Sequence, residues 1–268
     1  MMITLLHYAN VNTYLIDGDK KILFDTGWAG SFNELCRVMG ENKCRLQDID
    51  YLFISHFHPD HMGIAQEIAN AGAVIVVFDV QKEYIHSADH IFEKEKRNRF
   101  VPIDDSKVKI LPISDSREFL SECGINGEVF HTPGHSDDSI SLWLDDDQAL
   151  FVGDLAPLYE LDAHKGTQTA ETWEKLLALK PKTVYYGHAR TAQLEQEVPR
   201  SGNKPSEKDL YSLVRTITKL LNKGFTVDEI AARTGADKVF VNDAARMYVT
   251  HPGVSVQGIL DRIEIKGK

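Results

Sequence analysis

The feature that most constrains this chain is a cluster of histidines directly after an apolar segment. Residues 51–54 have the pattern of a buried strand, and Ser-His-Phe-His-Pro-Asp-His follows at once over residues 55–61. Three histidines within six residues are rarely a chance event in a chain with 11 histidines among 268 residues. Neutral imidazole is a good zinc ligand, and carboxylate can complete a ligand set. The sequence therefore predicts a metal site where a strand leaves its sheet.

The spacing within this cluster favours two metal positions over one. His56 and His58 are two residues apart, so on an extended chain their rings leave on the same side. Asp60 and His61 come after Pro59 and are displaced along the chain. A second metal position beside the first would use that displaced pair.

Three more candidate ligands have the same local setting. His135, Asp154 and His188 each follow a glycine, which permits a tight backbone turn. Each also comes just after a strand-like run, at residues 128–131, 148–152 and 183–186 respectively. Together with the first cluster they give seven ligands in order along the chain.

Short apolar runs alternate with helical patterns through the first 190 residues. Strands are predicted at 3–6, 13–16, 21–24, 51–54, 73–78, 108–111, 128–131, 139–144, 148–152 and 183–186, and helices at 32–39, 64–71 and 169–179. The highly charged residues 86–106 are predicted to form a surface helix or loop. This alternation is typical of an α/β fold in which helices cover a sheet.

The order of these residues resembles the metallo-β-lactamase superfamily over about residues 1–192, most closely its glyoxalase II branch. The matching residues are His56, His58, Asp60, His61, His135, Asp154 and His188, with Asp25 in Phe-Asp-Thr-Gly as a further hallmark. The resemblance implies a four-layer αβ/βα sandwich with metals at the open edge of two sheets. It also implies that His56, His58 and His135 hold a first metal, and Asp60, His61 and His188 a second. Asp154 would bridge both metals, and Asp25 would lie beneath the metal loops.

The resemblance further implies a dinuclear metallohydrolase. Two divalent ions, zinc first with iron or manganese as alternatives, would share a hydroxide that attacks a small ester-like substrate: a thioester, ester, lactone or phosphoester. Asp60 and Asp154 would be the residues that move a proton. Two differences from known branches of the superfamily narrow the choice of substrate class. Pro157 stands where lactonases have a tyrosine, and residues 200–268 do not resemble a glutathione-binding tail.

The end of the chain differs from the rest in pattern and charge. A polar linker at residues 199–206 separates a catalytic domain, 1–198, from a mostly helical domain, 199–268. The net charge is −14 over residues 1–199 and +4 over residues 200–268. Helices are predicted at 208–221, 226–234 and 237–248, with a strand at 259–265 that would complete a winged-helix-like unit. Three roles stay open for it: anchoring nucleic acid for a nuclease activity, forming a homodimer, or shaping the substrate pocket.

Composition sets the remaining expectations. No run approaches the roughly 18 apolar residues of a membrane helix, and three widely spaced cysteines give no disulfide framework. We therefore expect a cytoplasmic protein that acts on a small molecule, with no membrane partner. A regulator that keeps the metals for structure alone is the remaining alternative to an enzyme. His7 and Asn12, on the first strands, are expected to face the site.

Overall fold

The structure, a computed structural model, describes residues 2–94, 99–194, 207–236, 238–250, 256 and 259. The chain forms two compact units, Met1–Gln196 and Glu197–Lys268, and each has its own hydrophobic core. The sequence places the boundary between residues 198 and 199. That position and the predicted linker at 199–206 lie outside the described residues.

The first sheet of the larger unit is built in chain order. Its strands are β1 (Met2–Tyr8), β2 (Val11–Asp17), β3 (Lys21–Phe24), β4 (Tyr51–Phe53), β5 (Val74–Phe78) and β6 (Val108–Leu111). The first three strands are antiparallel, and β3 to β6 are parallel to their neighbours. The helices that connect the parallel strands include α1 (Phe32–Glu41) and α3 (Ala65–Asn70).

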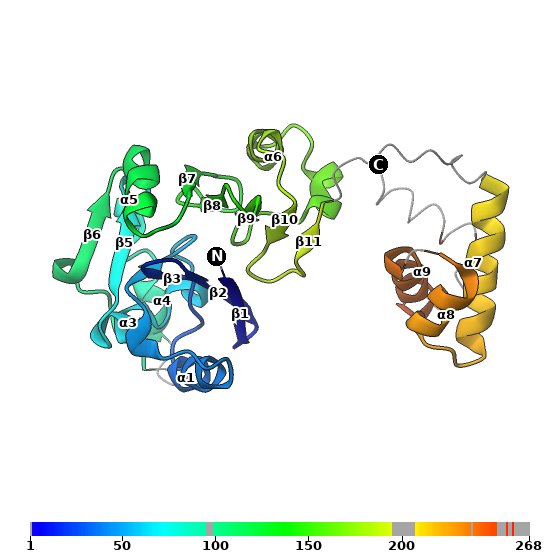
Figure 1. Cartoon of the computed structure of the whole chain (residues 1–268), viewed down its shortest axis with the longest axis horizontal. Helices are drawn as coiled ribbons and strands as arrows, with labels where there is room; N and C mark the ends of the chain where they lie inside the picture. Colours follow the sequence, from blue (N-terminus) through cyan, green and yellow to red (C-terminus); the bar gives the residue numbers. More distant parts are fainter. Residues whose placement is uncertain are drawn as a thin grey trace. The chain divides into compact units, whose positions relative to one another are not determined.

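The second sheet follows in the second half of the unit. Its order is β11 (Ala192–Gln193), β10 (Thr183–Tyr185), β9 (Ala149–Phe151), β8 (Ile140–Leu144) and β7 (Gly127–His131). Only β9 and β10 are parallel; the other neighbours are antiparallel. Helix α6 (Gln168–Ala178) lies between β9 and β10 in the chain (Figure 1).

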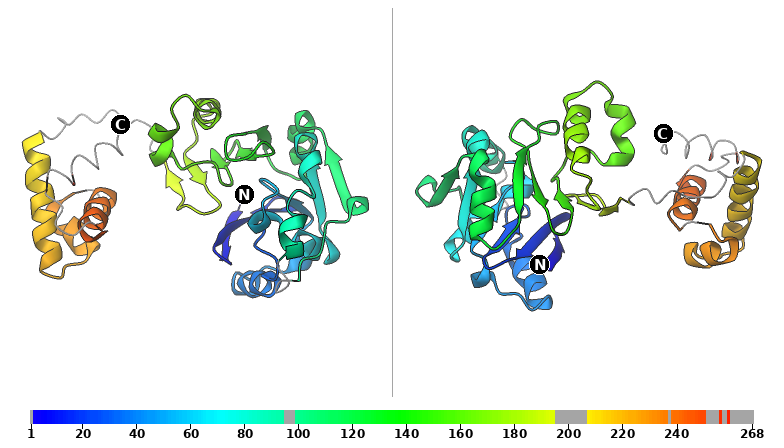
Figure 2. Two further views of the ribbon diagram at one scale, coloured as in Figure 1. Left: turned by 180° about the vertical axis from the view of Figure 1, so that it is seen from behind. Right: turned by 45° about the horizontal axis from the view of Figure 1, so that its top comes forward.

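Successive side chains along these strands point to opposite faces of the sheets and pack into three hydrophobic layers. Leu23 packs with the buried residues of α1 and α3, whereas its neighbours Ile22 and Phe24 pack between the two sheets. Trp143 and Leu150 of the second sheet pack instead against Trp173 of α6. Burying one such side chain contributes about 1.5–3 kcal/mol. The order helix, sheet, sheet, helix confirms the predicted four-layer sandwich (Figure 2).

Aromatic side chains join the two sheets at the end of the unit that carries the histidines. Tyr14 of β2 meets Phe151 of β9 edge to face, with ring centroids 5.2 Å apart. It meets Tyr185 of β10 in the same way at 5.1 Å. Such pairs stabilise a core by about 0.5–1.5 kcal/mol beyond their buried area. This contact fixes β2 against β9 and β10.

Several short elements were not predicted. They include α2 (Pro59–Met62), α5 (Ser116–Glu122) and β11, whereas α4 (Asp89–Lys94) lies within the stretch 86–106 predicted as a surface helix or loop. Short 3₁₀ helices occur at Leu46–Asp48, Asp79–Tyr84, Asp105–Lys107, Ile113–Asp115 and Leu158–His164. A helix of four to seven residues shows at most two turns of apolar spacing, which is too short a pattern to recognise. Within the charged stretch 86–106, residues 95–98 lie outside the described residues.

The smaller unit is helical, as predicted. It contains α7 (Glu207–Asn222), α8 (Val227–Thr234) and α9 (Lys238–Thr250). Thr226 and Glu229 form a capping box that starts α8, and Gly235 ends it in a left-handed conformation with φ 66°. The predicted strand at 259–265 is wrong at Ile259, which is helical and packs in the helical core; residues 260–265 lie outside the described residues. An apolar run of that length does not separate a strand from a buried helical turn.

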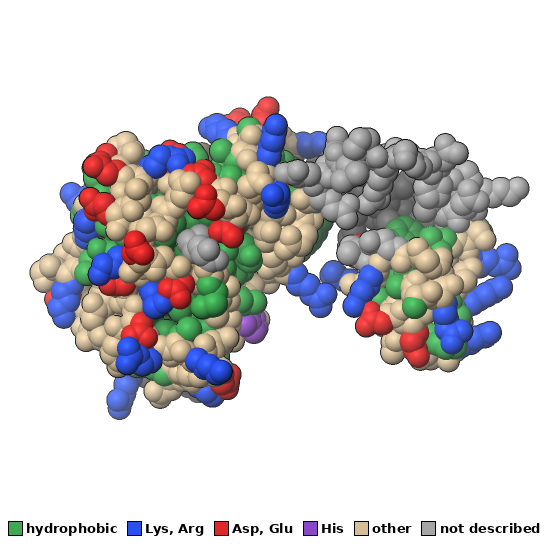
Figure 3. Space-filling view, in the orientation of Figure 1, with side chains coloured by type: hydrophobic (Ala, Val, Ile, Leu, Met, Phe, Trp, Pro, Cys, Tyr) green, Lys and Arg blue, Asp and Glu red, His purple; other side chains and the backbone are tan. Residues whose placement is uncertain are grey.

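The two units carry their surface charge differently. On the face drawn in Figure 3, Lys and Arg side chains gather along one side of the helical unit, whereas both signs are mixed over the larger unit. Within the described ranges, no helix has the length and apolar character needed to cross a membrane.

Candidate metal centre

The first four candidate ligands leave β4 on a loop that turns into a helix. His56 and His58 lie on the extended segment, and His58 is the residue that precedes α2. Pro59 occupies the start of α2, where its fixed φ suits a helix and its missing N–H costs no hydrogen bond. Asp60 and His61 then stand on the first turn of α2. The change from extended chain to helix separates the two pairs of side chains.

The other three ligands arrive from the second sheet, each shortly after a strand. His135 follows β7, Asp154 follows β9, and His188 follows β10. The glycines before two of them are required by close approach between loops. A Cβ on Gly153 would lie 2.5 Å from Ser55 Oγ, and one on Gly187 would lie 2.5 Å from Asp154 Oδ1. Gly153 also has φ 54°, a conformation that side chains disfavour.

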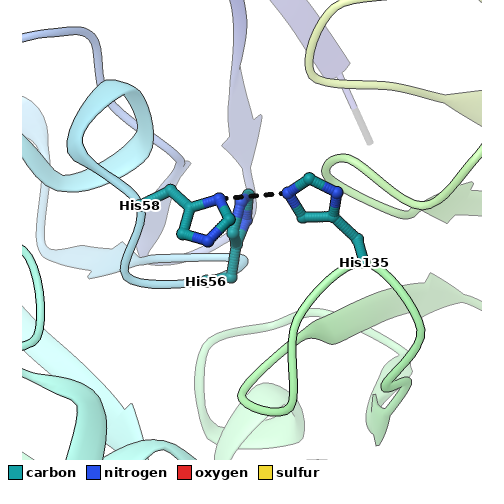
Figure 4. A group of neighbouring side chains, drawn as sticks. All are labelled: His56, His58 and His135. Atoms are coloured by element: carbon teal, nitrogen blue, oxygen red, sulfur yellow. Dashed lines mark hydrogen bonds between the residues drawn. The ribbon is translucent and has the colours of Figure 1, made fainter.

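His56, His58 and His135 form one group, which we call the histidine trio. Their candidate ligand nitrogens all lie within 4.8 Å of one another. His135 Nε2 is 3.0 Å from His58 Nδ1, and the three rings point toward one another (Figure 4). Two nitrogens that each lie about 2.0 Å from a tetrahedral zinc are roughly 3.3 Å apart. The trio therefore already has near-ligand spacing.

Asp60, His61, Asp154 and His188 form a second group, which we call the mixed group. Its candidate ligand atoms also lie within 4.8 Å of one another. His188 Nε2 is 3.0 Å from Asp60 Oδ2, and His61 Nε2 is 3.2 Å from Asp154 Oδ1. The structure thus brings all seven predicted residues together, in the two sets that the resemblance implied.

Asp154 lies between the two groups. Its Oδ2 is 3.5 Å from His188 Nε2 in the mixed group and 3.7 Å from His135 Nε2 in the trio. A carboxylate has two oxygens and several lone pairs, so one side chain can serve two cations. Asp154 is placed where a bridging ligand would stand.

Three buried polar atoms at this centre lack hydrogen-bond partners. They are His56 Nε2, His61 Nε2 and Asp154 Oδ1. A buried polar atom without a partner costs about 1–3 kcal/mol, so such atoms call for an explanation. All three belong to side chains of the two groups, and imidazole nitrogens and carboxylate oxygens are atoms that can bind a metal. A divalent cation at each group would satisfy them, so the residues present fit a pair of metals.

Hydrogen bonds to the opposite ring nitrogens fix which nitrogen each histidine presents. His61 Nδ1 is 3.0 Å from Asp25 Oδ2, and His188 Nδ1 donates to Asn10 O at 2.7 Å. His56 Nδ1 is 2.9 Å from Ser55 Oγ. In all three residues Nε2 is left for a metal. Such outer partners orient ligands and raise their basicity.

Asp25 has the position that the resemblance implied. It is 1% exposed and lies beneath the histidine loop, where its Oδ1 also accepts a hydrogen bond of 2.6 Å from Ser55 N. Its φ is 68°, a left-handed conformation that aspartate adopts more readily than most residues. One carboxylate therefore supports both the histidine loop and a ligand of the mixed group.

Burial and neighbouring charges shift the ligand pKa values in opposite directions. Burial, reinforced by nearby His61, lowers the pKa of His56 well below its usual range, which keeps that ring neutral. Burial also opposes charge on His61, but the attraction of Asp25 and Asp154 outweighs it and raises the pKa of His61 to about 10. Burial opposes ionisation of Asp60, yet the hydrogen bond from His188 lowers the pKa of Asp60 to about 2. The mixed group therefore stabilises positive charge, whereas burial lowers the pKa values of His56 and His135 and favours their neutral rings.

Two buried residues near the trio were missed in the sequence. Asp138 is 3% exposed, and its Oδ2 accepts a hydrogen bond of 2.6 Å from Phe57 N, between the two histidines of the loop. Gln81 is fully buried and donates from Nε2 to the carbonyls of Ile54 at 2.9 Å and Asp138 at 3.2 Å. Asp138 lies three residues after His135, next to Asp137. The sequence alone does not show which of these two aspartates is buried against the histidine loop.

His7 and Asn12 pair with each other beside the His188 loop. His7 Nδ1 is 2.8 Å from Asn12 Oδ1, and Asn12 Nδ2 donates to Tyr186 O and Ala189 O at 3.0 Å each. Asn12 thus contacts the backbone on both sides of His188, and His7 contacts Asn12. By contrast, His131 Nε2 binds the carbonyl of Asp137 at 2.7 Å and belongs to the backbone turn after β7.

Comparison with known proteins agrees with this geometry. The family model described as the metallo-beta-lactamase superfamily matches residues 9–188, and the chain belongs to that superfamily. The superfamily is hydrolytic, and its fold binds divalent metals.

Two curated relatives and one solved structure illustrate the likeness. A beta-lactamase-like protein 2 homolog of Drosophila melanogaster is 27% identical over 68% of this chain and 59% of its own length. An atrochrysone carboxyl ACP thioesterase of Claviceps purpurea is 23% identical over 83% of this chain and 66% of its own length. The chain thus spans less than two thirds of either relative. A beta-lactamase from Chitinophaga pinensis shares the fold, with TM-score 0.54 and 21% identity over 70% of this chain and 75% of that one.

Proposed function

We propose that this protein is a dinuclear metallohydrolase that cleaves a small ester-like substrate. The observation that carries the proposal is the pair of adjacent ligand groups joined by Asp154, whose Oδ2 lies 3.7 Å from His135 Nε2 and 3.5 Å from His188 Nε2. We take the metals to be zinc, because imidazole nitrogens supply five of the seven ligands. Iron or manganese would use the same residues.

Two bound divalent ions would supply Lewis acidity and lower the pKa of water toward neutral. The chain's own residues do the rest. His56 and His61 are buried and form the floor, while His58, His135 and His188 are exposed and form a rim open to substrate. A substrate carbonyl or phosphoryl group would enter over that rim.

The two carboxylates at the centre are suited to holding a proton in place. Burial opposes ionisation of Asp154, but the neighbouring His61 ring outweighs it and lowers the pKa of Asp154. Asp60 and Asp154 are therefore ionised at neutral pH and accept hydrogen bonds. Because their pKa values are low, they orient a reacting proton more effectively than they remove one.

A thioester is the first substrate class to test. The support is the name of the Claviceps purpurea relative, an ACP thioesterase that aligns with 83% of this chain. Esters, lactones and phosphoesters present the same kind of electrophile to a metal pair. We further propose that the substrate is a small molecule and that the protein acts in the cytoplasm, where free Cys36, Cys44 and Cys123 would stay reduced.

A nuclease or phosphodiesterase with a helical anchor is the alternative. Its support is the row of exposed basic side chains at Arg215, Lys219 and Lys223, spaced four residues apart along α7 and just past its end. Residues at that spacing share one face of a helix. Such a face would bind phosphates and lose affinity steeply as salt rises. The same exposed face would also suit a homodimer, for which the chain gives no further support.

The deciding experiment measures metal content and hydrolysis together. Metals per chain would be counted on tag-free protein, and the same protein assayed on thioester, ester, lactone, phosphodiester and RNA substrates. We expect about two metals per chain and activity that a chelator abolishes. One metal or none, or activity indifferent to chelators, would overturn the proposal. Activity on RNA that falls with salt would favour the nuclease instead.

A further inference from the structure

The hairpin between β1 and β2 contacts the loop that carries His188. Asn12 N donates to Gly187 O at 2.7 Å, and Asn12 Nδ2 donates to Tyr186 O and Ala189 O at 3.0 Å each. Tyr186 O accepts a further bond of 2.8 Å from the hydroxyl of Tyr14 on β2. The first sheet thus holds three carbonyls of a loop from the second sheet.

The same hairpin touches the ligand itself. His188 Nδ1 donates to Asn10 O at 2.7 Å, so Nε2 is the nitrogen left to bind a metal. That Nε2 lies 3.0 Å from Asp60 Oδ2 and 3.5 Å from Asp154 Oδ2. The direction of the His188 ring therefore depends on where the hairpin holds the loop.

His7 fixes the orientation of the Asn12 amide. Asn12 Oδ1 can only accept, so at 2.8 Å it takes the proton of His7 Nδ1. The amide nitrogen then has both of its protons directed at Tyr186 O and Ala189 O. Both amide protons and the amide oxygen are therefore engaged, which makes Asn12 a rigid support and not a surface polar residue.

The backbone of the turn between β1 and β2 is strained where it presents Asn10 O to His188. Ala9 and Asn10 both have left-handed backbones, with φ 47° and 64°. Asparagine tolerates that conformation, but alanine disfavours it. Strained backbone persists where its surroundings fix it, and this turn is the one that carries Asn10 O to His188.

We propose that Asn12 is a positioning residue for the mixed group, acting through His188 on the metal bound there. The proposal deepens the function proposed above and rests on it. Asn12 is no metal ligand, and none of its hydrogen bonds reaches the trio. Its loss should therefore weaken one metal position and spare the other.

The test measures the two stepwise metal affinities of the full chain. Zinc would be titrated in competition with a chromophoric chelator into wild type, Asn12→Ala and Asn126→Ala. Asn126 is a matched control because its amide donates to Asp146 on the surface at 3.2 Å. His188→Ala and His135→Ala identify which step belongs to which group. We expect Asn12→Ala to weaken the His188 step about 10- to 100-fold, as outer-shell changes do, and Asn126→Ala to change neither step.

A double-mutant cycle separates positioning from a general loss of structure. If Asn12 acts through His188, Asn12→Ala should cause no further loss of metal affinity in the His188→Ala background. Thermal unfolding of the metal-free variants runs in parallel. If Asn12→Ala does not fold, Asn12→Asp takes its place, because it keeps the shape and loses both donor protons.

The outcomes separate this inference from the proposed function. The inference is supported if Asn12→Ala weakens only the metal affinity of the His188 step and causes no further loss when His188 is already alanine. Two unchanged steps, or an equal loss in both, overturn it while wild type still binds two metals. Fewer than two metals on wild type overturns the proposed function as well.

Discussion

The histidine trio and the mixed group lie side by side, yet they are built on different physical principles. The trio consists of imidazoles alone, and burial keeps His56 neutral. The mixed group includes two carboxylates, and Asp25 lies behind it as a third. Neutral nitrogens hold a metal by coordination, whereas the carboxylates add attraction for its charge. The two metal positions should therefore respond differently to the same kind of substitution.

The largest effect is expected where the two groups meet. Asp154→Asn removes the charge that lies within 3.7 Å of a histidine from each group. Changing an outer-shell partner already costs about 10- to 100-fold in affinity or activity, so loss of a shared ligand should cost more. We expect hydrolysis to fall at least about a hundredfold, with weaker metal binding at both groups.

Asp146→Asn is the control for this change. Asp146 is an exposed carboxylate in the turn between β8 and β9. Its replacement by asparagine should leave activity and metal content unchanged. If Asp154→Asn weakened only one of the two metal positions, Asp154 would not be shared between them.

The next effect should separate the two groups. Asp25 and Asp138 are both buried carboxylates that accept a backbone N–H of the histidine loop at 2.6 Å. Only Asp25 also bonds a ligand, through His61 Nδ1. Asp25→Asn should therefore weaken metal binding at the mixed group about 10- to 100-fold. Asp138→Asn should act on the trio, by loosening Phe57 between His56 and His58.

Competition titrations on both variants provide the measurement, and each variant is the matched control of the other. Asparagine tolerates the left-handed backbone of Asp25, so the change removes charge without adding strain. An identical pattern of loss in the two variants would mean that the loop responds as one body and that the groups are not separately supported.

A smaller effect is expected from two glycines that bring the sheets together. A Cβ on Gly153 would crowd Ser55 beside the trio, and a Cβ on Gly187 would crowd His61 Cε1 at 2.8 Å in the mixed group. Gly153→Ala should destabilise the fold by about 1–3 kcal/mol and weaken the trio. Gly187→Ala should cost a similar amount and weaken the mixed group.

Gly166→Ala is the control for backbone strain. Gly166 has φ 75°, similar to the 54° of Gly153, but a Cβ there would meet nothing within 4 Å. It should lower the unfolding temperature through strain alone, with both metal affinities intact. Metal affinities that fell equally in Gly153→Ala and Gly166→Ala would show that strain, and not contact with Ser55, governs the trio.

The sequence was informative about the ligands and much less so about what supports them. His56, His135 and His188 each come after a strand, and the order of all seven ligands along the chain made them predictable as a set. Their supports could not be predicted, because Asn12 and Tyr186 are 174 residues apart, and Gln81 and Asp138 are 57 apart. Contacts at such separations are set by how the two sheets pack. No local periodicity encodes that arrangement.

The smallest effect on metal binding is expected at His86, which lies between two aspartates, as His61 does. His86 Nδ1 is 2.9 Å from Asp89 Oδ2, and its Nε2 is 2.9 Å from Asp105 Oδ1. Both ring nitrogens are therefore engaged, and the side chain is 46% exposed. Unlike His56 and His61, this ring has no nitrogen left for a metal. His86→Ala should leave the metal stoichiometry and both affinities unchanged.

Its effect on stability should depend on pH. Burial opposes charge on His86, but the hydrogen bonds to Asp105 and Asp89 outweigh it and raise the pKa of His86 above 6.5. The ion pairs therefore stabilise the fold below pH 6.5, and this contribution is lost as the pH rises through the raised pKa. For such exposed pairs we expect His86→Ala to cost a few tenths of a kcal/mol at pH 5.5 and nothing at pH 9. Denaturant unfolding at the two pH values measures this difference. If His86→Ala lost metal, a histidine between two carboxylates would be enough to bind a cation. A free Nε2 atom would then not be what distinguishes the histidines of the metal centre from His86.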